Sequence, residues 1–170
     1  RKNANANGTA AATAAVATAR RALEMSPTEY SLRALGWALA FSGDYQTLEA
    51  ELSARETTLT PVLRYALAHA RAAQGRRAEA LRMLDAMAKN APDDEARRDV
   101  RLVRAQLFAG DGDAAGVWAE AKALLFVDPR RAGLLAPYLA WLGDLEHARN
   151  VLGRIIGLKR PTMRSMALPA

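Results

Sequence analysis

Residues 61–92 read PVLRYALAHARAAQGRRAEALRMLDAMAKNAP, and this stretch decides the fold. Its apolar residues recur at helical spacing on both sides of Gly75: Leu63, Leu67, Ala70 and Ala73 precede the glycine, and Ala80, Leu84 and Met87 follow it. Gly75 tolerates the positive φ that a tight turn requires. Thr60-Pro61 is typical of a helix start, and Pro92 of a stop. The stretch predicts a helical hairpin with small faces, which allows it to stack on copies of itself.

Copies of this hairpin recur along the chain. Residues 30–45 read YSLRALGWALAFSGDY, with a turn at Gly43-Asp44-Tyr45. The turn and second helix recur at Gly143-Asp144-Leu145, followed by Ala148, Leu152 and Ile155. Asp111-Gly112-Asp113, with Ala121, Leu124 and Pro129, forms a weaker copy, and Ala15, Ala19, Ala22 and Pro27 form half a unit. The recurrence, at a spacing of about 34 residues, predicts a helical repeat array.

In this spacing the chain resembles the tetratricopeptide repeat (TPR) family. The family's small, aromatic, alanine and proline positions are occupied by Gly36, Tyr45, Ala80, Pro92, Pro129 and Ala148. The resemblance covers nearly the whole chain, and it lies in the recurrence rather than in any one position. It implies an all-α fold, a right-handed α-solenoid of stacked antiparallel helix pairs.

The repeats give a division of the chain. We expect a disordered or linker segment at 1–9 and a single array over 10–170: a half repeat at 10–27, repeats at about 28–60, 61–92, 93–128 and 129–160, and the start of a further helix at 161–170. Both ends interrupt a repeat, and the first residue is Arg1, so we expect the sequence to be part of a longer protein. In the third repeat the frame stays open, because the extra residues fit either the segment after Pro92 or a longer loop at 109–114.

Several local features carry expectations of their own. Ser26-Pro27-Thr28-Glu29 predicts a helix start with Ser26 as its cap and Glu29 completing a capping box. Gly36, in the middle of a helix, predicts close helix approach, and Leu48 is expected to push the two helices apart slightly. Pro137 lies inside a predicted helix and predicts a kink between Gly133 and Pro137. The second helix of the first full repeat is expected from Tyr45 to about Thr57, and the last predicted second helix runs from His147 to Ile156 and ends at Gly157.

Composition excludes several classes of protein. There is no Cys, so disulfides and thiolate metal sites are excluded. No apolar run approaches the roughly 20 residues of a membrane helix, so we expect no direct membrane insertion. Residues 24–146 hold all 18 acidic residues but only 15 of the 24 basic ones, so their net charge is −3 and the basic excess lies at the ends. We therefore expect no nucleic-acid partner. The abundance of Ala and Arg is typical of a GC-rich bacterial genome, and both cytoplasm and periplasm stay open.

The TPR resemblance also implies candidate partner-binding residues, because the first helix of each pair lines the concave face in that family. These are Tyr30, Arg33, Trp37 and Phe41 in the first full repeat, Val62, Tyr65 and His69 in the second, Leu102 and Gln106 in the third, and Arg130 and Trp141 in the fourth. Aromatic rings with a few cations suit a bound peptide. The alternative is that Trp37 and Trp141 pack between neighbouring hairpins.

Other clusters favour structural roles. Arg97, Arg98, Arg101 and Arg104 stand beside Asp93, Asp94, Glu95 and Asp99; they either bind an acidic partner or, as we favour, form a solvated face with local i, i+4 pairs. His69 and His147 lack the spacing of metal ligands, and no nucleophile or phosphate-loop motif is present, so we expect no metal, no cofactor and no enzymatic activity.

The expected function is a noncatalytic protein–protein interaction scaffold that binds a peptide or partner helix in its concave groove. Arrays that look like this one serve in bacterial envelope, secretion or polysaccharide-export assemblies. Two alternatives stay open: an architectural spacer, and a regulatory array attached to a DNA-binding or catalytic domain. Self-association is also expected through apolar residues of the terminal half-repeats, namely Val16, Leu23, Met163, Met166 and Leu168.

Overall fold

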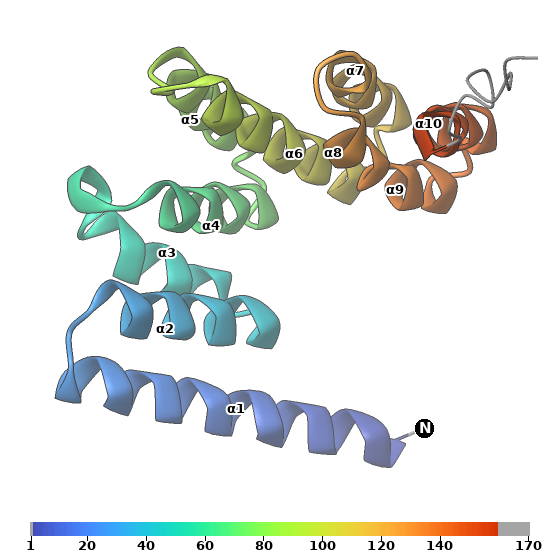
Figure 1. Cartoon of the computed structure of the whole chain (residues 1–170). Coiled ribbons are helices and arrows are strands. Elements are labelled where there is room, and N and C mark those ends of the chain that lie inside the picture. The colour runs from blue at the N-terminus through green and yellow to red at the C-terminus, as the bar shows by residue number, and fades with distance from the viewer. Residues whose placement is uncertain (1, 160–170) are drawn as a thin grey trace, which may run out of the picture. The chain divides into compact units, whose positions relative to one another are not determined.

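The chain folds into helices throughout the part that the computed structural model describes, which is the backbone of residues 2–159 and the side chains of residues 10–157 (Figure 1). The helices are α1 (Lys2–Met25), α2 (Glu29–Ser42), α3 (Tyr45–Ser53), the 3₁₀ helix η1 (Glu56–Thr58), α4 (Pro61–Ala73), α5 (Arg77–Lys89), α6 (Asp94–Gly110), α7 (Ala114–Leu125), α8 (Pro129–Gly133), α9 (Ala136–Trp141) and α10 (Leu145–Lys159). No strand occurs in this range. The all-α prediction is confirmed. The further helix expected at 161–170 lies outside the described residues.

The array expected from the sequence divides into two compact units, Arg1–Ala86 (unit 1) and Met87–Ala170 (unit 2). In unit 1, α1 packs on α2, α2 on α3 and α4, and α3 on α4. Its core contains these buried residues: Ala19, Leu32, Leu35, Leu39, Leu48, Leu52, Leu59, Leu63, Leu67 and Ala70. Val16 and Leu23 of α1 pack against this core, so they are not simply an exposed apolar end.

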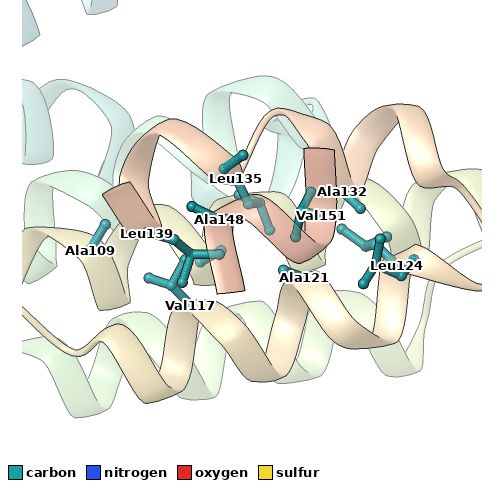
Figure 2. Close-up of a cluster of buried hydrophobic side chains, with 12 residues drawn as sticks. Ala109, Val117, Ala121, Leu124, Ala132, Leu135, Leu139, Ala148 and Val151 are labelled. Atoms are coloured by element: carbon teal, nitrogen blue, oxygen red, sulfur yellow. The ribbon is translucent and has the colours of Figure 1, made fainter. Parts of the chain in front are cut away.

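Unit 2 is built around α7 and α10. Helix α6 packs on α7, and α7, α8, α9 and α10 pack on one another. The side chains between them form the second core, shown in part in Figure 2: Ala105, Ala109, Val117, Ala121, Leu124, Leu125, Ala132, Leu135, Ala136, Leu139, Ala148 and Val151. Many of these residues are alanines, which is why these helices can approach closely.

The same turn closes the helices in both units, as the sequence predicted. Gly43, Gly75, Gly112 and Gly143 all adopt φ between 75° and 83°, the left-handed region that favours glycine. In three of the turns the next residue is an aspartate whose Oδ1 accepts a backbone N–H three residues on: Asp44, Asp113 and Asp144. The local sequence Gly-Asp therefore ends one helix and begins the next.

The pair formed by α2 and α3 corresponds position by position to the pair formed by α8–α9 and α10. Leu35 and Leu39 of α2 are fully buried, and so are their counterparts Leu135 and Leu139. At the next two corresponding positions the residues differ in size, but the small and large side chains offset each other. Gly36 and Leu48 lie in contact in unit 1, whereas Ala136 and Ala148 share the core of unit 2.

Helix boundaries differ from the expectations at four places. Helix α1 includes residues 2–9, assigned above to a linker, because no proline separates them from the Ala-rich stretch and each added residue gains one hydrogen bond. Helix α2 begins after Thr28, not Ser26, and its capping box is completed by Ser31 rather than Glu29. Helix α3 ends at Ser53, before η1, and α10 continues past Gly157 to Lys159.

The structure also settles the frame of the third repeat. Helix α6 has 17 residues, compared with 13 in α4, while the following turn is short, so the extra residues lie between Pro92 and the turn. At Pro137 the chain is interrupted, not just kinked: α8 ends at Gly133 and α9 begins at Ala136. Pro137 then occupies the first turn of α9, where no partner for its missing N–H is needed.

Candidate partner-binding surface

Helix α2 carries a row of large side chains on the side opposite its core residues, made up of three exposed aromatic residues and one half-buried arginine. We call Tyr30, Arg33, Trp37 and Phe41 the α2 aromatic stripe. Its rings are 81%, 57% and 82% exposed at Tyr30, Trp37 and Phe41, whereas Leu32, Leu35, Gly36 and Leu39 of the same helix are buried. The helical repeat of 3.6 residues separates the two sets onto opposite faces.

Within the stripe the side chains are arranged in two pairs. The rings of Trp37 and Phe41 stack with centroids 6.0 Å apart and planes 28° from parallel. The guanidinium carbon of Arg33 lies 5.9 Å from the centroid of the Tyr30 ring. The stripe therefore presents an apolar pair at one end and a cation resting on a ring at the other.

The helix that carries the stripe is held at both ends. Thr28 accepts the N–H of Ser31, and Ser31 accepts that of Thr28. The other end closes at Gly43. Thr60 precedes α4, and its hydroxyl donates to Glu29 Oε1 at 3.0 Å, which links the starts of α2 and α4. The stripe thus stands on a fixed element, as a binding surface requires.

The candidates on α4 are less accessible. Helix α4 adjoins α2, with a Leu63 methyl 3.9 Å from where a β-carbon on Gly36 would lie. Val62 is exposed, but Tyr65 and His69 are half-buried and have contacts of their own. The structure therefore places them on a helix that packs against α2, with smaller accessible surfaces than the α2 side chains.

In unit 2 some of the predicted binding residues are exposed and others are half-buried. Arg130 is exposed and Trp141 is 72% exposed, at the positions that correspond to Tyr30 and Phe41. Leu102 instead packs against the core, and Gln106 is half-buried with a partner. Sequence reasoning missed six large apolar residues that are exposed in the described part of this unit: Phe126, Val127, Leu134, Leu145, Leu152 and Ile156. The exposure of Leu134 could have been predicted, because it occupies the position that the exposed Ala34 occupies in α2. No feature of the sequence indicated the exposure of Phe126 and Val127, which follow the end of α7.

The alternative reading of the tryptophans is wrong for Trp37 and Trp141, which are exposed. The tryptophan that does pack internally is Trp118, which lies against the core of unit 2 and stacks on His147 with ring centroids 4.0 Å apart. His147 Nδ1 is in turn 2.7 Å from Asp144 Oδ2. This hydrogen bond is the main cause that lowers the pKa of Asp144 below 3.8. His147 therefore holds the carboxylate of Asp144 at the start of α10.

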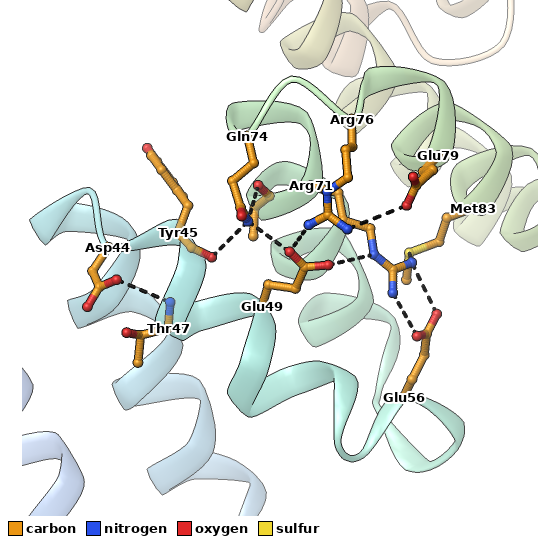
Figure 3. Close-up of polar contacts among 11 residues, drawn as sticks. Asp44, Tyr45, Thr47, Glu49, Glu56, Arg71, Gln74, Arg76, Glu79 and Met83 are labelled. Atoms are coloured by element: carbon orange, nitrogen blue, oxygen red, sulfur yellow. Dashed lines mark hydrogen bonds and ion pairs between the residues drawn. The ribbon is translucent and has the colours of Figure 1, made fainter.

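Two charge networks, neither expected from the sequence, join helices within the units. In unit 1, Glu49 of α3 interacts with Arg71 of α4 and Arg76 of the following turn (Figure 3). Glu49 also accepts from Gln74 at 2.8 Å, and Glu56 pairs with Arg71, again at 2.8 Å. These partners are distant in sequence, so local spacing gave no signal for them.

In unit 2 the arginine cluster of α6 pairs mostly with other helices. Arg101 and Arg104 both lie 2.9 Å from carboxylate oxygens of Glu120 on α7, a residue only 5% exposed. Arg98 reaches Asp128, and only Arg97 forms a local pair, with Asp94. The expectation of local pairs is therefore wrong for Arg98, Arg101 and Arg104, while Arg97 and Arg101 remain exposed to solvent. Charge that looked available to a partner is used to join α6 to its neighbours.

Two other kinds of site are absent from the described residues. In that part of the chain no three His, Asp or Glu side chains gather as metal ligands would. None of the helices described is both long and apolar enough to cross a membrane.

Comparison of the sequence with protein-family models, of the chain with curated proteins, and of the fold with solved structures gave no significant match.

Proposed function

We propose that this chain is a noncatalytic protein–protein interaction scaffold, a TPR-like right-handed α-solenoid in which the α2 aromatic stripe binds a peptide or helix of a partner protein. The observation that carries the proposal is the exposure of Tyr30, Trp37 and Phe41 on one face of one helix. Binding residues of protein interfaces are enriched in aromatic side chains and arginine. We extend the proposal to the corresponding face of α8 and α9, which exposes Arg130, Leu134 and Trp141.

The repetition of helix pairs supports the scaffold part of the proposal. The Gly-Asp turns, the buried leucines Leu35 and Leu135, and the exposed rings of Phe41 and Trp141 recur at corresponding positions. A repeat that keeps both its core residues and its exposed apolar residues is typical of proteins that bind extended partners along their length.

The arrangement of the titratable groups supports a noncatalytic role. The most buried carboxylate, Glu120, is held by two arginines, and Asp144 and His147 serve the start of α10. Each of these groups has a structural partner, whereas a general acid or base must be accessible to a substrate.

A display experiment tests the proposal directly. A random peptide library is selected on the full chain, and the affinities of the selected peptides are measured by fluorescence anisotropy. We expect peptides whose affinity falls at least tenfold for the double variant Trp37→Ala, Phe41→Ala, because truncation of central aromatic residues commonly costs more than 1 kcal/mol each.

The matched control is Trp118→Phe, which changes a tryptophan that packs against the core of unit 2. This variant is expected to leave binding unchanged. If the selected peptides bind the double variant as well as the unaltered chain, the α2 aromatic stripe is not the binding surface. If the library yields no binding peptide, the architectural spacer is the better description.

A further inference from the structure

We propose that the segment bound by the α2 aromatic stripe is acidic at one end and apolar at the other, with a carboxylate on Arg33 and an apolar side chain on the Trp37–Phe41 pair. This inference rests on the proposed function and adds the chemistry and direction of the partner.

The first argument is the charge of the two helices at this surface. Helix α2 contains one acidic residue, Glu29, and α4 contains none. Glu29 already accepts the hydroxyl hydrogen of Thr60. The cations on these helices are Arg33, Arg64 and Arg71. Arg71 is paired with Glu49 and Glu56, so the excess positive charge of these two helices rests on Arg33 and Arg64, although residues 24–146 as a whole are net negative.

The second argument concerns Arg33 itself. Several arginines of the described chain, such as Arg71, Arg101 and Arg131, pair with carboxylates. Among residues 10–157, Arg33 has no carboxylate within pairing distance, and its guanidinium lies over the Tyr30 ring. The ring orients the guanidinium and shields one of its faces from water, which leaves the N–H groups available to a carboxylate from a partner.

The third argument is the order of groups along the stripe. Arg33 is in the first half of α2, and the stacked rings of Trp37 and Phe41 are in the second half. Eight residues of helix separate Arg33 from Phe41, a distance of about 12 Å. An extended segment spans that distance with about four residues, and a helical one with about eight. The two ends differ in chemistry, so one direction of the bound segment is favoured.

The test compares two peptides of about twelve residues, long enough to span ~12 Å in either form. They share one apolar half, containing Leu and Phe, and differ only in having Glu or Lys in the other half. Affinities for the full chain are measured by fluorescence anisotropy. We expect the Glu peptide to bind about fivefold more tightly, because one exposed attraction is replaced by one repulsion. The difference should shrink as salt rises to about 0.5 M.

Two variants complete the test. Arg33→Glu is expected to reverse the preference, while Arg82→Glu, which alters an exposed arginine of α5, is expected to keep it. The inference is overturned if the two peptides bind equally, or if Arg33→Glu leaves their order unchanged, while Trp37→Ala still weakens both. That pattern leaves the proposed function intact. Binding that is absent for both peptides, or insensitive to Trp37→Ala, overturns the inference and counts against the proposed function as well.

Discussion

Two helical glycines with different surroundings show how a single β-carbon matters in this protein. A β-carbon on Gly36 would lie 3.7 Å from Leu48 Cδ1 and 3.9 Å from Leu63 Cδ2, which are ordinary contacts. A β-carbon on Gly116 would lie 2.6 Å from Phe108 Cγ and 2.7 Å from Asp113 Oδ2, closer than atoms can approach. Of these two sites the tight one is therefore Gly116, where no close approach was predicted. Leu48 is buried, and its side chain packs beside Gly36.

We predict opposite effects for alanine at the two sites. Gly36→Ala should raise the free energy of unfolding by up to about 1 kcal/mol, because alanine favours the helix and the space exists. Gly116→Ala should lower it by about 1–3 kcal/mol, because the Phe108 ring or the Asp113 cap must move. Urea unfolding measures both. A loss of stability in Gly36→Ala, or none in Gly116→Ala, would show that these surroundings are wrongly described.

At the scale of elements, Glu120 joins α6 to α7 through Arg101 and Arg104. We predict that Glu120→Gln lowers the free energy of unfolding by about 1–3 kcal/mol, because a buried amide cannot replace both charged hydrogen bonds. Arg97→Ala is the control: its pair with Asp94 is exposed, so its effect should stay within about 0.5 kcal/mol. Equal effects of the two substitutions in urea unfolding would contradict this.

The aspartates that cap α8 and α10 make the stability of unit 2 depend on pH. The backbone N–H and then the guanidinium of Arg131 lower the pKa of Asp128 below 3.8, and the side chain and N–H of His147 do the same for Asp144. A lowered folded-state pKa stabilises the fold above pH 3.8, and this contribution is lost as the pH falls through the folded-state value.

We therefore predict that Asp128→Asn and Asp144→Asn reduce stability near neutral pH and weaken its dependence on pH in acid. Asparagine keeps a capping oxygen but has no charge to lose. Unfolding free energies measured between about pH 7 and about pH 2 check this. An acid dependence as steep in the double variant as in the unaltered chain would mean that other carboxylates cause it.

At the scale of the whole molecule, the two compact units have separate cores that can be weakened in turn. Leu39 of unit 1 and Leu139 of unit 2 occupy corresponding positions and are both fully buried. We predict that Leu39→Ala and Leu139→Ala each cost about 2–5 kcal/mol, felt first in the unit that contains the substitution. Hydrogen exchange should show lost amide protection mainly in that unit. Equal loss across both units in either variant would indicate one cooperative core.

The α2 aromatic stripe also has a meaning at this scale. Large aromatic side chains exposed together are uncommon on a surface that binds nothing. The TPR resemblance implied these residues, and in the structure Trp37 and Phe41 are exposed on the side of α2 opposite the buried Leu35 and Leu39. Which helical face is buried was inferred only by resemblance, and exposure could not be known before the packing partners of α2 were known.

The sequence by itself determined the helices and their turns, because both depend on residues within a few positions of each other: apolar spacing, Gly43 and Gly143 for positive φ, and Asp128 as a cap with Pro129 in the first turn. Only the tertiary structure decided the partners across helices. It assigned Glu120 to Arg101 and Arg104, Glu49 to Arg71, and Phe108 to the space beside Gly116. Such contacts join residues far apart in the chain, so they depend on how whole helices pack, which local spacing does not encode.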